Sequence, residues 1–392
     1  MRPSENETYD AVVVGGGVIG LACGWRAAQR GLDVCVIDRA APGAGATGVA
    51  AGMLAPIGEA SWGEEALLEL NLASARMYPD FAAGLEDASG KPVGYRRCGA
   101  LHVALDRDEA EELQRRNELQ RSLGLDAECL RPRRCRELEP GLSTACAGGV
   151  HARDEGEIDP RALATALAAA AERAGATVMS GAEAAEGLVE EGRLVGVRTT
   201  DGRELRARDV VVASGWESGV APWLPPEARP PVRPVKGQIV GLCGPAEQPL
   251  CKRIVATPWI YVVPRDDGRV VVGATVEEQG EDLRVTAGGV HELLREAYRV
   301  LPEVTELELT EARAGLRPGT PDNSPVIGRG ALEGLILATG HYRNGILLAP
   351  ITAEAVAALL VGDEVPESAR ALGPERFEPA AGGHPAEEIA AR

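Results

Sequence analysis

The sequence predicts an α/β fold in which a Rossmann-like, dinucleotide-binding domain with a GxGxxG turn is interleaved with an antiparallel, β-rich domain. The first observation is a glycine turn at 15–20, between a short apolar strand and a helical segment. The second is a β-rich block over 232–275, and the third is a further strand and helix over 335–360. Because nucleotide-type patterns lie at both ends of the chain, we expect the first domain to be built from separated segments.

The domain limits follow from this alternation. The ranges expected for the nucleotide-binding domain are 1–85, 140–225 and 310–365. The ranges expected for the substrate-binding domain are 86–139 and 226–309. The last segment, 366–392, contains the stretch PAAGGHPAEE and is expected to be a disordered tail.

Hydrophobic periodicity and turn residues predict the individual elements. At Asp159 and Pro160 a capping residue precedes a proline at the first helical position, so a helix is expected to run from there to Gly175. The triplet DDG at 266–268 predicts a hairpin turn. The predicted helices are 21–30, 64–85, 107–123, 160–174 and 346–360, and the predicted strands are 11–14, 34–37, 177–179, a hairpin over 187–200, 209–213, 259–263 and 335–338.

Composition excludes several classes of protein. The chain has 392 residues, a formal charge of −18 and a pI near 4.9, which repels phosphate backbones and anionic lipids, so we expect no nucleic-acid partner. No stretch holds the roughly 20 strongly apolar residues of a membrane span, and the polar start carries no signal-peptide pattern, so we expect a cytoplasmic protein without a membrane partner. The eight cysteines form no CxxC pair and the five histidines lack metal-ligand spacing, so no metal site is predicted.

The glycine turn has the spacing of a dinucleotide fingerprint. Gly15 allows a tight turn, Gly17 lets the backbone approach a pyrophosphate, and Gly20 lets helix and strand pack closely. Asp38 ends the next strand and is placed to bind ribose hydroxyls. The helix that begins here directs its positive dipole at the phosphates. The motif alone does not distinguish NAD from FAD.

The rest of the chain favours FAD, although FAD enzymes more often carry Glu at the position of Asp38. A nicotinamide dehydrogenase would continue with further parallel βα units. Here the third segment is instead the small-residue loop PGAGATGVAAGMLAP at 42–56, and the sheet is completed from the far end of the chain. Glycines in this loop suit a backbone that lies close against a ligand.

Five runs of sequence resemble the FAD-dependent amine oxidases of the D-amino-acid oxidase superfamily, and within it the bacterial glycine oxidases. They are GGGVIG (15–20), ATGVAAGMLAP (46–56), PVKGQIV (234–240), GLRPGTPD (315–322) and GHYRNGILLAP (340–350). The resemblance extends from about residue 10 to about residue 360 and implies an FAD-binding domain of the Rossmann type.

The resemblance also implies which residues contact FAD. Small residues of the early loop would lie along the flavin, Ala184 would contact the adenine side, and the N–H groups of 341–347 would converge at a helix start on the flavin's negative edge. Gly48 stands where many relatives carry serine, and Met53 as core filler is the alternative for that residue. The expected contacts are Gly15, Gly17, Val18, Ile19, Gly20, Asp38, Arg39, Ala46, Thr47, Ala51, Gly52, Met53, Ala184, His341, Tyr342, Arg343, Asn344, Gly345, Ile346 and Leu347. Covalent flavin attachment in the enzymes that this sequence resembles uses a cysteine near the C-terminal flavin segment or a histidine in the early loop. Because 252–392 lacks cysteine and 40–60 lacks histidine, FAD is expected to be bound noncovalently.

Two arginines are candidates for the substrate site. Arg317 precedes Pro318, so its backbone is extended, and its fork can clasp a carboxylate bidentately. The resemblance implies the same role, and an exposed turn arginine is the alternative. Arg343 is expected to face the substrate side, with a plain surface loop as its alternative.

Tyr261 is the third candidate. Period-two alternation over 259–263 puts Trp259, Tyr261 and Val263 on one face of a strand. The resemblance makes the Tyr261 hydroxyl a second carboxylate ligand, whereas a core tyrosine is the alternative. The family can carry histidine where Trp259 stands and methionine where Val276 stands, which leaves the size of the pocket open.

The activity implied by the resemblance is oxidative deamination of glycine. The amine would lose a hydride to the flavin without a side-chain base, because orientation and the cofactor supply the chemistry. Dioxygen would reoxidise the flavin to give hydrogen peroxide, and the imine would yield glyoxylate and ammonia or feed thiazole formation in thiamine biosynthesis. The resemblance also implies a homo-oligomer, namely a tetramer. The alternatives are a sarcosine or D-amino-acid oxidase, a dehydrogenase with another electron acceptor, and a flavin-binding protein without turnover.

Overall fold

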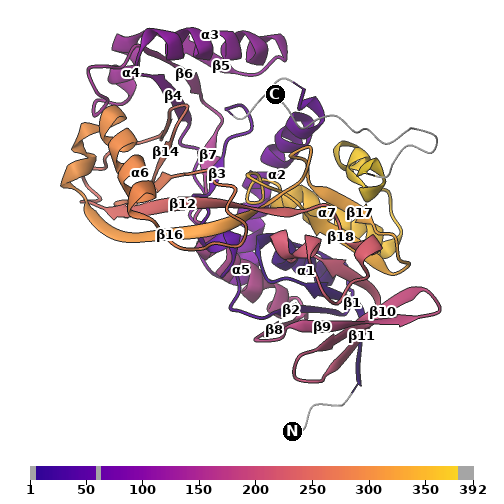
Figure 1. Cartoon of the computed structure of the whole chain (residues 1–392). Coiled ribbons are helices and arrows are strands. Elements are labelled where there is room, and N and C mark those ends of the chain that lie inside the picture. Colours follow the sequence, from indigo (N-terminus) through magenta and orange to yellow (C-terminus); the bar gives the residue numbers. More distant parts are fainter. Residues whose placement is uncertain (1–5, 59–62, 378–392) are drawn as a thin grey trace.

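The computed structural model describes residues 6–58 and 63–377, whose strands form two large sheets (Figure 1). The strands of the first sheet are β1 (Asn6–Val14), β2 (Val34–Asp38), β8 (Thr177–Ser180), β9 (Ala184–Glu190), β10 (Arg193–Thr199), β11 (Glu204–Val212), β17 (Val326–Arg329) and β18 (Leu335–Thr339). Their order is β17-β18-β11-β1-β2-β8, and the β9–β10 hairpin joins beside β11. Because β1 runs parallel to both β2 and β11, the predicted Rossmann-like arrangement is confirmed.

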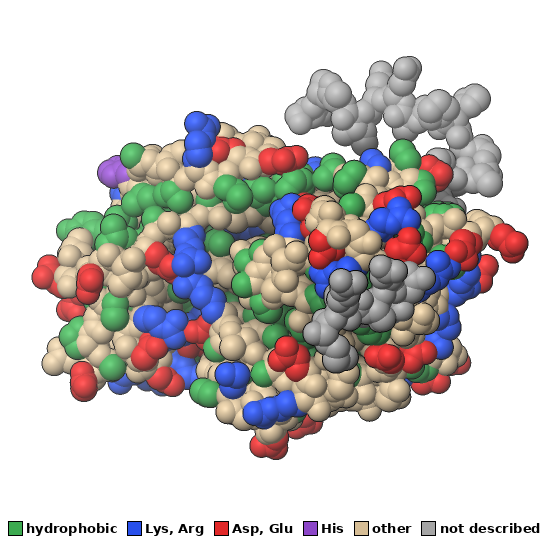
Figure 2. All heavy atoms as spheres, turned by 90° about the horizontal axis from the view of Figure 1, so that it is seen from below, with side chains coloured by type: hydrophobic (Ala, Val, Ile, Leu, Met, Phe, Trp, Pro, Cys, Tyr) green, Lys and Arg blue, Asp and Glu red, His purple; other side chains and the backbone are tan. Residues whose placement is uncertain are grey.

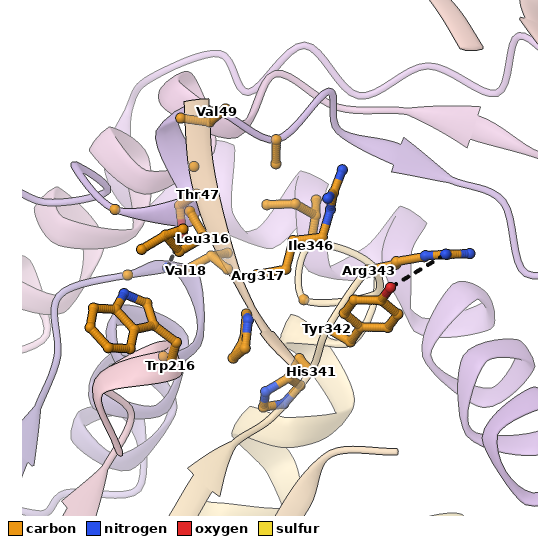
Figure 3. A pocket seen from close by; sticks show the side chains of 18 of the residues that line it. Val18, Thr47, Val49, Trp216, Leu316, Arg317, His341, Tyr342, Arg343 and Ile346 are labelled. Carbon is orange, nitrogen blue, oxygen red and sulfur yellow. Dashed lines mark hydrogen bonds between the residues drawn. The ribbon is translucent and has the colours of Figure 1, made fainter. Parts of the chain in front are cut away.

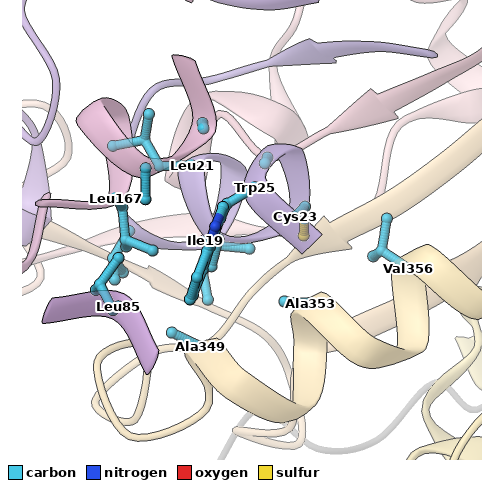
Figure 4. Packing of buried hydrophobic residues seen from close by; sticks show 14 of the residues in the cluster. Ile19, Leu21, Cys23, Trp25, Leu85, Leu167, Ala349, Ala353 and Val356 are labelled. Atoms are coloured by element: carbon cyan, nitrogen blue, oxygen red, sulfur yellow. The ribbon is translucent and has the colours of Figure 1, made fainter. Parts of the chain in front are cut away.

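Four helices pack together over one face of this sheet. They are α1 (Val18–Gln29), α2 (Glu65–Ser89), α5 (Pro160–Arg173) and α7 (Ala349–Val361). Figure 4 shows Trp25 of α1 among Leu85 of α2, Leu167 of α5 and Ala353 of α7. Small side chains on α7 let that helix approach α1 closely, so the helix that begins at the glycine turn is firmly held.

The other face of the first sheet is also covered. Val12 and Val14 of β1 point to this face, where they join a cluster with Leu194 of β10 and with Trp223 and Leu224. Apolar residues on both faces are typical of buried parallel strands. The strand β1 is therefore almost continuously apolar from Ala11 onward.

The second sheet is mainly antiparallel. Its strands are β4 (Ala100–Ala104), β5 (Ala127–Leu130), β6 (Gly148–Ala152), β12 (Arg233–Cys243), β13 (Ile254–Ala256), β14 (Tyr261–Pro264), β15 (Arg269–Gly273) and β16 (Glu308–Gly319). Their order is β16-β12-β15-β14-β13-β4-β6-β5, with β4 and β13 parallel. Helix α6 (Ala287–Val300) packs Leu293 and Ala297 against Val240 and Val262 on one face. Helix α3 (Arg107–Ser122) packs Leu113 against Ala104 on the other.

Short elements complete the chain. They are α4 (Pro132–Leu138), the paired strands β3 (Met53–Leu54) and β7 (Gly156–Glu157), and the 3₁₀ turns η1 (Ala46–Gly48), η2 (Gly215–Gly219), η3 (Pro226–Ala228), η4 (Pro302–Glu306), η5 (Glu367–Leu372) and η6 (Pro374–Phe377). The predicted start of α5 is confirmed, because the Asp159 carboxylate accepts hydrogen bonds from the N–H groups of Arg161 and Ala162. The predicted hairpin turn between β14 and β15 is confirmed as well.

Two strands lie outside the predicted limits of the second domain. Strand β6 falls in 140–225 and strand β16 falls mostly in 310–365, yet both belong to the second sheet. The reason is pairing at a distance: β16 runs alongside β12 from Arg233 opposite Gly319 to Cys243 opposite Glu308. Sequence patterns identify strands but not their partners.

Three other expectations need correction. The predicted tail is ordered over 367–377, where Ala369 and Leu372 are buried against Leu348, and the rest of it, 378–392, lies outside the described residues. The last helix begins at Ala349 rather than at 346, because turns occupy the preceding residues. The strand predicted over 259–263 begins at Tyr261, since Thr257 accepts hydrogen bonds within a turn.

Three further observations concern the described residues. No helix in the described ranges is long and apolar enough to cross a membrane. Among the same residues no group of three or more His, Cys, Asp or Glu side chains is arranged to hold a metal. On the face seen in Figure 2, acidic and basic side chains are interspersed rather than gathered by sign.

Candidate functional site

A cavity of about 1250 Å³ lies where the two sheets meet, lined by residues of both. Its wall includes the glycine turn after β1, the end of β2, the loop around 46–53 and the strands β14 and β16. Small-molecule sites commonly measure roughly 300–1,000 Å³. This cavity is therefore large enough for a dinucleotide together with a small substrate.

The glycine turn is packed so tightly that larger residues are excluded. Gly15 has a φ of +120°, and a Cβ there would lie 2.4 Å from the carbonyl oxygen of Ala213. A Cβ on Gly20 would lie 1.8 Å from the carbonyl oxygen of Gly15. Gly17 precedes α1, so the helix begins at the cavity wall with its positive dipole directed there. This is the backbone cradle that the fingerprint requires.

The first helical turn is held from the side by the early loop. The N–H of Val18 donates to Oγ1 of Thr47 at 3.1 Å, a contact drawn in Figure 3. Gly52 has a φ of +80°, and a Cβ there would lie 1.9 Å from the carbonyl oxygen of Ile158. A Cβ on Gly48 would lie 2.7 Å from the carbonyl oxygen of Gly43, so a larger residue has no room here without a backbone shift.

Asp38 and its neighbours form the end of the cavity nearest β2. The Asp38 carboxylate accepts the N–H of Gly16 at 2.6 Å and that of Ala40 at 2.7 Å. The carboxylate is thereby fixed at the cavity wall, and its remaining lone pairs can still accept ribose hydroxyls. Arg39 is exposed and pairs with Glu217, whose pKa is raised by burial although Arg39 opposes this.

The segment 341–347 follows β18 and is a series of turns. Because β18 and β1 both run parallel to β11, this segment lies at the same carboxyl edge of the first sheet as the glycine turn. Tyr342 has a φ of +46°, and its N–H donates to the carbonyl oxygen of Pro318 at 3.0 Å. His341 is buried and its Nε2 lies 3.0 Å from Oγ1 of Thr352. Burial lowers the pKa of His341 to about 3, so this imidazole is neutral. Leu347 does not line the cavity, and its carbonyl oxygen accepts the hydroxyl of Ser74 at 2.6 Å.

Arg317 lies on β16, and its side chain enters the cavity (Figure 3). Its Nη1 donates to the carbonyl oxygens of Lys236 at 3.3 Å and Thr275 at 3.1 Å. A Cβ on Gly237 would lie 2.3 Å from this Nη1, so glycine provides the space for the guanidinium. Within the described residues its other N–H groups have no hydrogen-bond partner. They are available to a carboxylate ligand.

A buried ionic network supports the segment behind Arg317. Lys236 is 0% exposed, and its Nζ lies 3.0 Å from the Asp282 carboxylate and 3.5 Å from that of Glu277. Glu277 also accepts Nε2 of Gln238 at 2.7 Å and Oγ1 of Thr275 at 2.5 Å. Hydrogen bonds from Arg284 and Lys236 hold the pKa of Asp282 well below its usual range. The carbonyl groups that orient Arg317 therefore belong to a rigid backbone.

Tyr261 and its surroundings form the wall on the second sheet. The Tyr261 ring lies over Gly273, where a Cβ would be 2.5 Å from the hydroxyl oxygen. Met53 packs against the same small cluster as Tyr261 and also lines the cavity. Trp259 and Val276, the two departures from the family pattern, line the cavity while remaining 62% and 54% exposed.

Arg343 lies at the edge of the cavity. Its guanidinium is exposed and sits 5.0 Å from the ring centre of Tyr342, with Nη2 3.4 Å from the Tyr342 hydroxyl. Figure 3 shows it extending away from Arg317 along Tyr342. The structure therefore brings Arg317 and Tyr261 to the cavity wall, whereas Arg343 is engaged by its neighbour.

All predicted site residues except Gly20 and Leu347 line this one cavity. Sequence reasoning missed several other lining residues, among them His102, Gly58, Arg116 and Trp216. None lies in a motif with recognisable spacing. Only strand pairing and helix packing bring them to the wall.

The cavity fits FAD on structural grounds. The glycine turn leaves backbone N–H groups and a helix N-terminus at the wall, Asp38 is fixed beside them, and Gly52 in the early loop has no room for a side chain. The site continues from there to Arg317 and Tyr261. The residues that line the cavity thus suit a long dinucleotide, with room for a substrate at the end of the cavity near Arg317 and Tyr261.

Comparisons with known proteins agree with this geometry. The model of the family DAO, FAD dependent oxidoreductase, matches residues 10–359. The bifunctional protein ThiO/ThiG of Synechocystis sp. is 37% identical over 376 residues, covering 94% of this chain and 54% of that protein. The glycine oxidase of Geobacillus kaustophilus is 35% identical over 356 residues, covering 90% and 93%. The chain thus spans about half the length of the ThiO/ThiG relatives.

Solved structures give the same result. The crystal structure of glycine oxidase from Geobacillus kaustophilus superposes with a TM-score of 0.88 at 34% identity, covering 95% of this chain and 100% of that one. That of glycine oxidase from Bacillus cereus has a TM-score of 0.84 at 31% identity, covering 91% and 96%. The match over residues 10–359 shows that the chain belongs to the DAO family of FAD-dependent oxidoreductases.

Proposed function

We propose that this protein is an FAD-dependent glycine oxidase. It would convert glycine and dioxygen to the imine, hence glyoxylate and ammonia, with hydrogen peroxide as the second product. The observation that carries the proposal is that the Arg317 guanidinium enters the cavity that also contains the glycine turn and keeps N–H groups without a partner among the described residues. A small amino acid bound there by its carboxylate would lie at the end of a dinucleotide site.

The chain's own residues would bind and orient the substrate. Arg317 holds the carboxylate, and the carbonyl groups of Lys236 and Thr275 hold Arg317. The Tyr261 hydroxyl is a second carboxylate ligand. Orientation of this kind supplies much of the rate enhancement when no covalent step is needed.

The cofactor site follows the predicted contacts. The turn at 15–20 and the start of α1 would hold the pyrophosphate, Asp38 the ribose, and the loops at 46–53 and 341–346 the flavin. When bound noncovalently, FAD supplies the two-electron acceptor for the amine. Arg343, at the cavity edge, would attract the substrate's carboxylate rather than clasp it.

The proposal also covers the use of the product imine, the compartment and the oligomeric state. The product imine would feed thiazole formation in thiamine biosynthesis, a role supported by the resemblance and by relatives named ThiO/ThiG. The protein would act in the cytoplasm as a homo-oligomer, with a tetramer implied by resemblance. Dioxygen and a small amino acid would be its other partners.

The visible spectrum of the purified protein tests this function. Anaerobic glycine should bleach the flavin absorbance, and air should restore it with one hydrogen peroxide formed per glycine. Oxygen uptake with glycine, sarcosine, D-alanine and D-proline then ranks the substrates. A protein that stays colourless after incubation with FAD, or a strong preference for a bulky D-amino acid, would overturn the glycine assignment.

A sarcosine or D-amino-acid oxidase, or a dehydrogenase of the same type, is the second candidate. The specific observation is the open wall at Trp259 and Val276, which are exposed beside the substrate position. A solved iminodiacetate oxidase from Chelativorans sp. is similar to this chain at 27% identity with a TM-score of 0.84. The same substrate panel, repeated with an artificial electron acceptor, separates these candidates.

A further inference from the structure

His102 on the cavity wall and the buried Glu155 behind it form a pair that substrate and cofactor binding leave unused. Glu155 is 0% exposed, and its Oε1 accepts the N–H groups of Ile57 at 2.9 Å and Gly58 at 2.6 Å. Its Oε2 faces Nε2 of His102 at 3.6 Å. Neither of these two facing atoms has a hydrogen-bond partner in the described chain, although both are sealed from solvent.

Strand register places this pair beside the substrate position. His102 on β4 is paired with Ala256 on β13, and Ala256 is paired with Tyr261 on β14. Paired residues of adjacent strands point to the same face of a sheet. His102 and Tyr261 therefore face the same cavity from positions two strands, or roughly 10 Å, apart.

The two nitrogens of His102 have different surroundings. Nε2 lies against Gly58, where a Cβ would be only 2.3 Å away, and is directed at Glu155. Nδ1 likewise makes no hydrogen bond to the described residues, but it is not sealed, and the side chain is 12% exposed. Because an ionised carboxylate only accepts hydrogen bonds, the hydrogen belongs on Nε2. The lone pair of Nδ1 is then open at the cavity wall.

The proposed function, on which this inference rests, creates a need for a proton acceptor. An amino acid reaches the site as an ammonium ion, and its nitrogen has no electron pair with which to form an imine until a proton leaves. Arg317 and Arg343 cannot accept it. His341 is neutral, but its Nε2 is engaged by Thr352. His102 is the other imidazole on the described cavity wall.

We propose that His102, oriented by Glu155, accepts through water the proton that the substrate ammonium must lose. An N–H bond of the ammonium breaks, its electron pair stays on the amine nitrogen, and a new N–H bond forms at Nδ1 of His102. The Glu155 carboxylate stabilises the imidazolium, as acidic residues do in other histidine dyads. No electron is transferred in this step, and the proton leaves to solvent before the next turnover. Glu155 is thus a positioning residue.

The neighbouring charges are consistent with this assignment. Helix α3 contributes Arg116 to the cavity wall, and its Glu109 carboxylate accepts the Nε1–H of Trp259 at 3.2 Å. The residues before α2 contribute Glu64 to the same wall. Of the acids in the described chain, Glu155 is the one whose free oxygen faces the imidazole.

The test compares FAD-loaded wild type and His102→Gln in kcat/KM for glycine from about pH 6 to about pH 10. At about pH 7 the variant should be roughly 10- to 100-fold slower, because a general base typically contributes 10²-fold or more. The deficit should vanish above the pKa of the substrate's own ammonium group, where solution supplies the neutral amine. Added imidazole should restore part of the rate at neutral pH. Glu155→Gln should show the same pattern with a smaller deficit.

His291→Gln, on the exposed side of α6, is the matched control and should keep the wild-type profile. A His102→Gln deficit of equal size at every pH would show a merely structural role and overturn the proposal. A His102→Gln enzyme with the wild-type pH profile of kcat/KM would also overturn the proposal, although the glycine oxidase function would still stand. A wild type that oxidises no amine at any pH would instead refute the proposed function and this inference with it.

Discussion

The nucleotide end and the substrate end of the cavity are built in opposite ways. The central part of the nucleotide end, with the glycine turn, the helix start and Asp38, comes from one continuous run, 14–38, in which glycine backbone makes much of the surface. The substrate end comes from strands far apart in sequence, with Arg317, Lys236 and Thr275 meeting across β12 and β16. The nucleotide end therefore depends on the absence of side chains at glycine positions. The substrate end depends on side chains that distant strands bring together.

This difference indicates how each end tolerates change. A turn without Cβ atoms has no spare volume, so any larger residue must displace backbone. A clamp held by a network of hydrogen bonds can lose one member and keep its fold, at a cost in substrate affinity. Substitutions at the two ends should therefore affect cofactor and substrate separately.

The largest effect is expected from Gly20→Val. A Cβ at this position would lie 1.8 Å from the carbonyl oxygen of Gly15, so the turn must open. FAD should no longer copurify, and the free energy of unfolding should fall by roughly 1–3 kcal/mol or more. The ratio of visible to ultraviolet absorbance and a urea titration measure both quantities. Gly288→Ala on α6, where a Cβ meets nothing within 4 Å, should keep the FAD content and should not lower the free energy of unfolding.

Arg317→Lys should come next. The charge is kept but the planar fork is lost, so KM for glycine should rise by roughly 100-fold while FAD content stays at the wild-type level. Steady-state oxygen uptake measures the KM. The matched control is Arg313→Lys, an exposed residue of the same strand that pairs with Glu311. Equal KM values in both variants would show that Arg317 is not the carboxylate ligand.

Lys236→Met should have a moderate effect that depends on pH. Loss of the ammonium leaves Asp282 and Glu277 without their buried cation, so KM should rise about tenfold and stability should fall by about 1–3 kcal/mol at pH 7. The pKa values of both carboxyls are lowered in the folded protein. Their contribution to stability is therefore present above the unfolded pKa, near about 4, and is lost as pH falls through the folded pKa.

Urea titrations of wild type and Lys236→Met at several pH values measure this dependence. The stability difference between the two proteins should be largest near neutral pH and should shrink as the solution is acidified. A difference that grows on acidification would contradict the proposed network. Arg284→Met, which removes an exposed partner of Asp282, should cost less stability because that pair is screened by solvent.

The smallest effect is expected at the open wall. Trp259→Ala removes a side chain that is 62% exposed, so stability should change by less than about 0.5 kcal/mol. The ratio of kcat/KM for sarcosine to that for glycine should rise by a few-fold, because the wall recedes. An unchanged ratio would show that Trp259 lies outside the reach of the substrate.

Much of the nucleotide end could be predicted from sequence because its physical causes are local. The helix after the glycine turn, the parallel pairing of β1 with β2 and the cap at Asp159 depend on residues a few positions away or on period alone. That helix begins at Val18, three residues before the predicted start at 21. The start of the last helix was predicted three residues early, since tertiary contacts such as Tyr342 with Pro318 hold that segment in turns.

The substrate end shows what sequence patterns miss. Arg317 and Tyr261 could be proposed because they lie in recognisable motifs. His102 and Glu155 could not, since nothing in their neighbouring residues indicates that β4 lies two strands from β14, with only β13 between them. The predicted domain limits fail at β6 and β16 for the same reason.

The sequence by itself determined the α/β class, the glycine cradle, the expectation of FAD and two candidates for the proposed substrate clamp. These depend on periodicity, on the absence of side chains and on short motifs, all of which are properties of adjacent residues. Only the tertiary structure decided that Lys236 supports Arg317, that Arg343 is engaged by Tyr342, and that His102 faces Glu155. Such contacts follow from strand order and register, which depend on pairing between distant segments.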